Sequence, residues 1–558
     1  MRRRFLIIIA AILLIVSGII WFVMTNNEDY VPHNEVSAHY DFNETDTEDE
    51  EEEDPYSAEE DVDLNTPQVL SRVEIPQALR ELTYANRSLA FPEPLADLDE
   101  LLNDFFTPNL TAETDIALAE RIMQYRQDDR PAPSELTHDE IVYEIDFLFE
   151  LLRYGYAAYQ YFGGDEVFLP LRESMLAQLA EMPNPLSTQL YVNSLLVPSL
   201  MDVIADNHVS IHHHTIGTHP IGVRSQFYLN SFLIVQRTES GFVTEIGDVL
   251  YKILEVINQD GREIEAIYPT LTREGEAAYA FGYVSYGHRS GTITPQMIQI
   301  HVLLENTENS ATHIRTINLA QVPNANVSHE NAFSTKEIDG IMILENRRLW
   351  QQQENDPPLQ NFVSTALPLR NEPVLVLDLR GNAGGNDGYA AQWVQLYTGR
   401  APVFSIDFRH LRLNSMTTNA ISPWIPQASP PEWNVWGSNL IVGNRYIDNE
   451  NLLIVLTDNA IGSSGDSFVS YLRQLTNMLI VGTNTQGVLV TGNVGSVSLP
   501  SSKAFIGFGT TLNIRPDLSQ FEGVGFMPDL WVPPNESLER VLKFIERYSI
   551  YQSIYEEE

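Results

Sequence analysis

The segment Val374-Leu-Val-Leu-Asp-Leu-Arg-Gly-Asn-Ala-Gly-Gly385 joins an apolar run to a glycine-rich loop. Both faces of the run are apolar, which is typical of a strand buried in a parallel sheet. The glycines that follow let backbone N–H groups approach a ligand closely, as an oxyanion hole or an anion site requires. A glycine after a strand also fits a plain turn, so this segment alone predicts the buried strand better than it predicts a function.

A second junction of the same kind lies about 80 residues further on. Leu452-Leu-Ile-Val-Leu456 is another buried-strand pattern, and Ile461-Gly-Ser-Ser-Gly-Asp-Ser-Phe468 follows it, with a helix predicted to begin near Ser467. A serine at such a turn has an exposed hydroxyl, and the neighbouring N–H groups are free for an anion. The competing interpretation is that Ser463 or Ser464 only caps the helix.

The chain around these junctions changes character twice. Residues 67–205 show apolar side chains at three- and four-residue intervals, which predicts helices, and one of them is expected to start at Ser134. Residues 209–322 favour β-branched and aromatic runs separated by turn residues, which predicts strands. From about residue 336 short apolar strands alternate with helical stretches, which favours a layered α/β core.

The N-terminal end predicts a membrane anchor. Three arginines precede Phe5–Met24, twenty uncharged residues that would span about 30 Å as a helix. The arginines favour a cytoplasmic N-terminus, and the bulky end of the stretch favours an uncleaved anchor over a signal peptide. Residues 28–63 contain 17 acidic residues and no Lys or Arg, which predicts a solvated spacer.

Composition excludes several classes of function. The net charge is −43, so nucleic acid is not an expected partner. The absence of cysteine excludes thiol nucleophiles, thiolate metal sites and disulfides. The cluster His212-His213-His214 with His219 offers no third metal ligand by its spacing, so neither a metal nor another cofactor is predicted.

In order and spacing, these motifs resemble the family of C-terminal processing peptidases and the tricorn protease core. The resemblance rests on Asp378-Leu-Arg-Gly-Asn-x-Gly-Gly385, the Ile461–Phe468 turn, Ile480-Val-Gly-x-x-Thr-x-Gly487, Gly523-Val-Gly-Phe-Met-Pro-Asp529 and Asp206-Asn-His208, and it covers roughly residues 135–545. It implies Ser463 as the nucleophile, with the backbone N–H groups of Ser464 and Gly384 as the oxyanion hole.

The resemblance also decides which base to expect. The bacterial processing peptidases carry a lysine about 25 residues after the serine, but Val488 occupies that position, and none of the four lysines of the chain fits it. The tricorn-type arrangement uses a histidine and a glutamate instead, which implies His208 as the base and Glu522 as its partner. Asn207 replaces the serine that links the two in tricorn, and it is expected to serve as a supporting residue.

The expected fold is α/β, with a ClpP/crotonase-like layered peptidase core, an N-terminal helical region and a β-rich insert that resembles a degenerate PDZ module. The predicted division is a basic cytoplasmic end (1–4), a transmembrane signal anchor (5–24), an acidic disordered linker (25–66), a helical region with the histidine motif (67–220), a β-rich PDZ-like region (221–325), a peptidase core (326–548) and an acidic tail (549–558).

The predicted function is that of a membrane-anchored serine peptidase, an endopeptidase that hydrolyses exported polypeptides on the extracytoplasmic side through an acyl-enzyme. Its expected partners are polypeptide substrates and the cell membrane. The alternative is an inactive member of the family that binds peptide or lipid at the cell surface, because the lysine is missing and Asn207 departs from the tricorn pattern.

Overall fold

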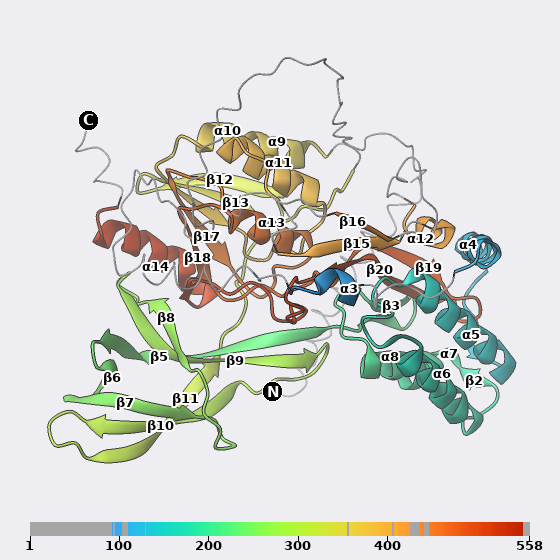
Figure 1. Cartoon of the computed structure of the whole chain (residues 1–558), viewed down its shortest axis with the longest axis horizontal. Coiled ribbons are helices and arrows are strands. Elements are labelled where there is room, and N and C mark those ends of the chain that lie inside the picture. Colours follow the sequence, from blue (N-terminus) through green and yellow to red (C-terminus); the bar gives the residue numbers. More distant parts are fainter. Residues whose placement is uncertain are drawn as a thin grey trace, which may run out of the picture. The chain divides into compact units, whose positions relative to one another are not determined.

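The computed structural model of the chain describes residues 92, 95–102, 110–128, 130–353, 356–403, 407–413, 415–423, 436–439 and 446–550 (Figure 1). The predicted anchor Phe5–Met24 and the acidic linker lie outside the described residues. Within the ranges just given, no helix has the length and apolar character needed to cross a membrane.

A six-stranded sheet forms the centre of the predicted core (residues 326–548), in the order β12-β13-β14-β17-β18-β21. Strand β14 lies parallel to β17 with Val374 opposite Leu452, which confirms the buried parallel strands expected from the sequence. Only β12, at one edge, is antiparallel to its neighbour. The strands are β12 (Phe333–Ile338), β13 (Ile341–Asn346), β14 (Val374–Asp378), β17 (Leu452–Thr457), β18 (Met478–Gly482) and β21 (Leu530–Trp531).

Helices cover both faces of this sheet, which explains why its strands are apolar on both sides. Leu375 and Leu377 of β14 point into a core shared with α9, α10, α11 and α13, whereas Val374 and Val376 point into a core shared with α14. Both strand ends that carry the candidate site are therefore anchored on two sides. The helices are α9 (Pro357–Ser364), α10 (Ala366–Leu369), α11 (Asp387–Thr398), α13 (Ser464–Leu472) and α14 (Pro534–Arg547).

A second sheet, in the order β16-β15-β20-β3-β4 with β19 also paired to β20, carries the histidine motif. Strand β3 begins two residues after His208 and pairs with β20, with Ile211 opposite Ile506. The strands are β3 (Ser210–His213), β4 (Gly217–Pro220), β15 (Arg409–Leu413), β16 (Trp436–Asn439), β19 (Thr491–Ser498) and β20 (Phe505–Ile514), and α12 (Met416–Ile421) lies between β15 and β16 in the chain.

The N-terminal helical region packs on this second sheet through one apolar core. Its elements are α3 (Leu98–Leu102), α4 (Ala112–Arg126), β1 (Glu135–Leu136), α5 (His138–Gly155), α6 (Gly164–Ala180), β2 (Leu186–Ser187), α7 (Thr188–Tyr191), the π-helix η2 (Val192–Leu196) and α8 (Val197–Val203). The predicted helix start at Ser134 is wrong. Thr137 caps α5 instead, in a reciprocal capping box with Glu140, because Glu135 and Leu136 pair with β2.

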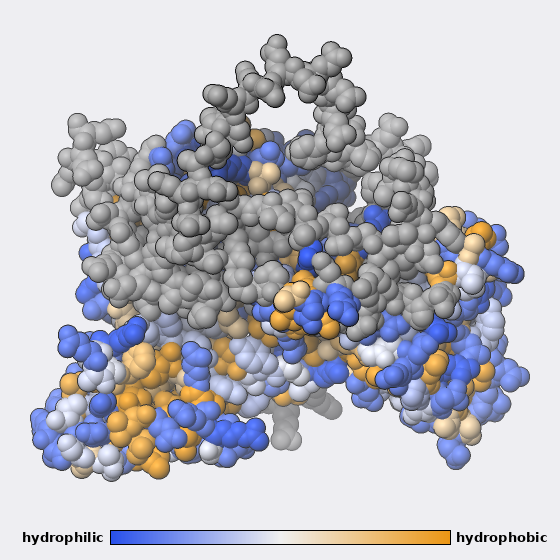
Figure 2. All heavy atoms as spheres, viewed as in Figure 1, coloured by the Kyte–Doolittle hydropathy of each residue, from blue (hydrophilic) through white to orange (hydrophobic). Residues whose placement is uncertain are grey.

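The β-rich region is a seven-stranded antiparallel sheet in the order β11-β10-β7-β6-β5-β9-β8, and β11 also pairs with β5. Apolar side chains gather over this region in Figure 2, and Leu250, Leu254 and Ile314 are among those exposed. Its PDZ-like character stays a prediction. The strands are β5 (Val223–Thr238), β6 (Gly241–Ile246), β7 (Val249–Ile257), β8 (Ile267–Leu271), β9 (Ala277–Arg289), β10 (Met297–Asn306) and β11 (Thr312–Gln321).

Candidate active site

Ser463 lies in a strained turn between β17 and α13. Its backbone has φ 53° and ψ −125°, a conformation that costs a non-glycine residue about 1–3 kcal/mol. The helix begins at Ser464, three residues earlier than the sequence predicts. Ser463 occupies the N-cap position, yet its side chain makes no capping hydrogen bond, so the capping interpretation is wrong for this residue. The turn therefore leaves the hydroxyl free for another partner.

The glycine-rich loop after β14 packs directly against this turn. A Cβ atom on Gly384 would come within 2.8 Å of the Ser463 Cβ and 2.7 Å of the Ser464 nitrogen, so only glycine fits there. The Ser464 hydroxyl donates to the Gly385 carbonyl at 2.8 Å, and the Gly462 N–H donates to the Asn382 carbonyl at 3.2 Å. The two junctions quoted from the sequence thus form one backbone cluster at the carboxyl ends of neighbouring strands.

The two predicted oxyanion donors differ in whether their N–H groups already have a hydrogen-bond acceptor. The N–H of Ser464 has no hydrogen-bond acceptor among the described residues. The N–H of Gly384 donates to the Asn382 side-chain oxygen at 2.9 Å. Ser464 is therefore free to bind an anion beside Ser463, whereas Gly384 would have to share or exchange its present acceptor.

His208 meets Ser463 across 255 residues of chain. Its Nε2 atom lies 3.0 Å from the Ser463 Oγ atom, and both residues are partly exposed. The other ring nitrogen, Nδ1, is buried and has no partner at hydrogen-bond geometry among the described residues. The Thr491 backbone nevertheless interacts with the imidazole and raises its pKa. A hydroxyl and an imidazole at this distance have the geometry of a nucleophile and its base.

Burial lowers the pKa of His208 below its usual value, against the opposing effects of Asp206, Thr491 and Asp387. Asp387 is the first residue of α11. Burial raises the pKa of its carboxyl, while the hydroxyls of Ser464 and Ser467 lower it. His208 is thus held in the neutral form that a general base needs.

Glu522 contacts the turn formed by residues 206–209, called the histidine turn below, but not the imidazole of His208. Its buried carboxyl accepts the Asn207 N–H at 2.7 Å, the Val490 N–H at 2.9 Å and the Leu489 N–H at 3.2 Å. No hydrogen bond between Glu522 and His208 is found in the part of the chain that the structure describes. Burial, reinforced by the nearby charge of Asp206, raises the pKa of Glu522 well above its usual range. Glu522 therefore braces backbone segments on both sides of the site.

Val488 lies where the processing peptidases would carry a lysine. Its side chain packs against Gly462, next to the serine, so the position faces the site but is apolar. The N–H groups of Gly487 and Val488 donate to the buried Asp466 carboxyl, whose pKa burial raises to about 7. Lys503, the lysine nearest in sequence to this position, forms an ion pair with Asp128 instead.

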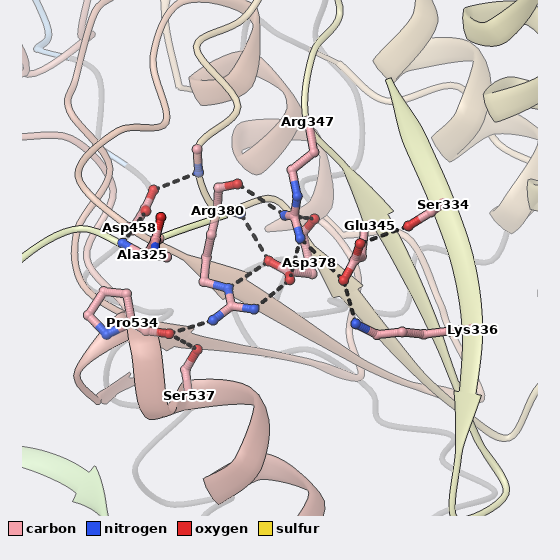
Figure 3. Close-up of polar contacts among 12 residues, drawn as sticks. Ala325, Ser334, Lys336, Glu345, Arg347, Asp378, Arg380, Asp458, Pro534 and Ser537 are labelled. Atoms are coloured by element: carbon pink, nitrogen blue, oxygen red, sulfur yellow. Dashed lines mark hydrogen bonds and ion pairs between the residues drawn. The ribbon is translucent and has the colours of Figure 1, made fainter. Parts of the chain in front are cut away.

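A buried ion-pair network fixes the loop after β14 (Figure 3). Arg347 and Arg380 both bind the Asp378 carboxylate, at 2.8 Å and 2.6 Å. Their side chains hold the pKa of Asp378 down, to about 2, although burial acts in the opposite direction. Asp458, which follows β17, accepts the Gly381 N–H at 2.9 Å and joins this loop to the chain that leads to Ser463. The arginine of the Asp378-Leu-Arg motif is thus part of the support beneath the site.

The cluster His212–His214, which follows His208 in the chain, makes contacts with neighbouring residues of β3 and β4. His212 Nδ1 lies 2.8 Å from the Thr218 hydroxyl on β4, and the rings of His213 and His214 stack with centroids 4.7 Å apart. Within the described ranges, no group of three or more His, Asp or Glu side chains is placed to hold a metal ion.

Sequence reasoning missed three residues of this neighbourhood. In the sequence, Asp206 stands out only as part of the Asp206-Asn-His208 motif, and Asp387 and Thr491 belong to no recognisable motif. Asp206 and Thr491 are 285 residues apart but share a hydrogen bond of 2.8 Å. No local signal marks such a pair. The sequence feature that indicates Asp387 is its position two residues after Gly385, at the end of the glycine-rich loop.

Comparison with known proteins finds a family match that includes part of the candidate site. Residues 348–532 match the model of Peptidase family S41, a range that includes Gly384, Ser463, Ser464 and Glu522 but not His208. No curated protein matches the sequence.

Three solved structures are similar to this chain at low sequence identity. Mature CPAF is 16% identical with a TM-score of 0.39, and the match covers 75% of this chain and 98% of that chain. The photosystem II D1 C-terminal processing protease is 15% identical (TM-score 0.31), with 72% of this chain and 94% of that chain covered. The tricorn protease is 14% identical (TM-score 0.28), with 75% of this chain and 37% of that chain covered.

Proposed function

We propose that this chain is a serine peptidase related to Peptidase family S41, whose model matches residues 348–532, with Ser463 as its nucleophile and His208 as its base. The observation that carries the proposal is the 3.0 Å distance between His208 Nε2 and Ser463 Oγ. The strained serine turn and the unoccupied N–H of Ser464 support it, since both belong to a nucleophile beside an oxyanion hole.

The proposed reaction follows the acyl-enzyme route. Ser463 Oγ attacks the scissile carbonyl while His208 Nε2 takes the hydroxyl proton, and the N–H of Ser464 donates to the oxyanion that forms. His208 then gives the proton to the leaving amine. A water molecule, deprotonated by the same imidazole, releases the acyl group and restores Ser463.

A fluorophosphonate probe tests this assignment, because it reacts with activated serines only. The full chain should be labelled, and the label should be lost in Ser463→Ala and strongly reduced in His208→Ala. A folded wild-type chain that takes no label would instead favour the alternative function, an inactive member of the family that binds peptide or lipid.

We further propose that the enzyme cleaves internal bonds of exported polypeptides from an anchored position outside the cytoplasmic membrane. The apolar stretch Phe5–Met24 behind three arginines and the acidic run that follows it support the location. Protease added to intact cells, or to spheroplasts if an outer envelope intervenes, should release a soluble fragment that starts in residues 28–66. Complete protection of the chain would contradict this topology.

Mass spectrometry of a digested unfolded protein tests whether the enzyme cleaves internal bonds, since an endopeptidase produces internal fragments.

A further inference from the structure

Asp206 is a fully buried carboxylate that the proposed reaction leaves without a role. It stands two residues before His208, and one of its oxygens accepts the backbone N–H of His208 at 2.8 Å. Its other oxygen accepts the hydroxyls of Tyr156 and Thr491, each at 2.8 Å. These three donors come from α5–α6, from the histidine turn and from β19, so the carboxylate joins three separate parts of the fold.

Two of these contacts converge on the imidazole. The hydrogen bond from the His208 N–H to Asp206 fixes the backbone that carries the His208 ring. The second holds Thr491, whose own backbone interacts with the imidazole. Because Nε2 faces Ser463, Nδ1 is the ring nitrogen that stays buried without a hydrogen-bond partner among the described residues, and the Thr491 backbone acts on the imidazole from nearby. A proton on Nδ1 leaves Nε2 unprotonated and able to accept the serine proton.

The charged and titratable groups around His208 divide into two sets. Asp206 from its own turn and Asp387 from α11 act directly on the imidazole. Glu522 does not, because its oxygens are taken by backbone N–H groups of residues 207, 489 and 490. The phenols of Tyr156 and Tyr161 face the same two carboxylates, and their pKa values are raised, so they stay neutral.

We propose that Asp206, rather than Glu522, is the carboxylate that positions His208 as the base for Ser463, through the His208 backbone N–H and through Thr491. Asp206 is a positioning residue, since it contacts neither the serine nor the substrate. This inference deepens the proposed function and rests on it. It assigns Glu522 a separate task, which is to hold the backbone of residues 207, 489 and 490.

The test compares Asp206→Asn with Glu522→Gln in the purified full chain, by the rate of fluorophosphonate labelling as a function of pH. Asp206→Asn removes a negative charge that raises the pKa of the imidazole. The rate should therefore fall about tenfold or more at neutral pH, and its acidic limb should move to lower pH. Glu522→Gln should lower the rate equally at all pH values with the limb unmoved. A limb that moves in Glu522→Gln and stays in Asp206→Asn would overturn the inference.

A milder pair of variants keeps the test decisive if Asp206→Asn does not fold. Thr491→Val removes the hydroxyl that binds Asp206, whereas Thr491→Ser keeps it. The acidic limb should move to lower pH in Thr491→Val and stay in place in Thr491→Ser. Identical limbs in both variants and in the wild type would contradict a role for this contact.

A second readout separates this inference from the proposed function. The imidazole of His208 can be titrated by NMR in the full chain, with its signal among the 13 histidines assigned through His208→Gln. A wild-type chain without label at Ser463 counts against the proposed function. An imidazole titration that is the same in the wild type and Asp206→Asn counts against the inference, whether or not the chain is labelled.

Discussion

The serine turn and the histidine turn meet at one point but are held there in different ways. The serine turn follows β17 of the central sheet. Backbone contacts with Asn382 and Gly384, in the loop after β14, hold it in place. The histidine turn precedes a short strand of the second sheet, and two buried carboxylates, Asp206 and Glu522, hold its consecutive backbone N–H groups. The proposed nucleophile is thus positioned by the regular geometry of a strand, a turn and a helix, and the proposed base by side chains from distant parts of the chain.

This difference has a consequence for how each turn responds to change. Backbone packing carries no net charge, so the direct contacts of the serine turn should respond mainly to added side-chain volume. The pH should act on this turn through the buried carboxylates around it, Asp378 and Asp466. Carboxylates titrate, so the histidine turn should respond to pH and to neutralising substitutions.

The largest effect is expected from Ser463→Ala. Removing the hydroxyl removes the nucleophile, so peptide hydrolysis should fall by at least about 10⁴-fold. The backbone strain at this position is the same for alanine as for serine, so the midpoint of thermal unfolding should change little. Initial rates on an unfolded protein substrate, together with calorimetry, would show both results. Hydrolysis that survives in Ser463→Ala would mean that another residue attacks the substrate.

His208→Ala should reduce turnover by about 10²–10⁴-fold, because the serine then lacks its base. Lys503→Met is the matched control. Lys503 pairs with Asp128, so its loss should leave turnover and the pH profile nearly unchanged. A lysine base would give the opposite pattern, with His208→Ala tolerated and Lys503→Met inactive. Steady-state kinetics of the two variants distinguish these outcomes.

The support beneath the serine turn should be sensitive to the charge of Asp378. Asp378→Asn removes the carboxylate that binds both buried arginines and leaves Arg347 with its ion pair to Glu345 at 3.4 Å, which should lower the free energy of unfolding by about 3–5 kcal/mol at pH 7. The pKa of Asp378 is lowered to about 2, so this contribution is present above the usual carboxyl range and is lost as the pH falls toward 2.

Urea denaturation of the wild type and Asp378→Asn at several pH values measures this contribution. Glu539→Gln provides the control, because Glu539 forms an exposed ion pair with Lys543 and its neutralisation should have no measurable effect. Equal changes in the two variants would show that the buried network does not stabilise the loop.

The smallest effect is a shift of the acidic limb of activity. Burial lowers the pKa of His208, and activity requires the neutral imidazole, so the limb should lie below about 6.5, the value of a free histidine. The enzyme should therefore retain activity at a pH where an unperturbed histidine is already half charged. Measurement of kcat/KM between pH 4 and 8 gives the limb directly, and a midpoint above 6.5 would mean that the charges of Asp206 and Asp387 outweigh burial.

The elements whose signals are local follow from the amino-acid sequence. The apolar runs at residues 374–378 and 452–456 become neighbouring parallel strands, because only buried strands tolerate apolar side chains on both faces. The glycines and serines after them become the paired loops of the site, because Gly384 and Ser463 adopt backbone conformations that are rare outside such turns. Even here the boundaries were imprecise. Thr137 rather than Ser134 caps α5, since a two-residue strand comes between them.

The contacts between the buried carboxylates and the turn around His208 become apparent only in the folded chain. The sequence places Asp206 next to His208 and Glu522 more than 300 residues away, but it does not say which oxygen meets which N–H. The contacts of Asp206 with Tyr156 and Thr491, and of Glu522 with residues 207, 489 and 490, exist only once β3, β19 and β20 are aligned in one sheet. Hydrogen bonds between distant residues depend on atomic positions that no local pattern encodes, whereas strands and turns depend on the preferences of neighbouring residues.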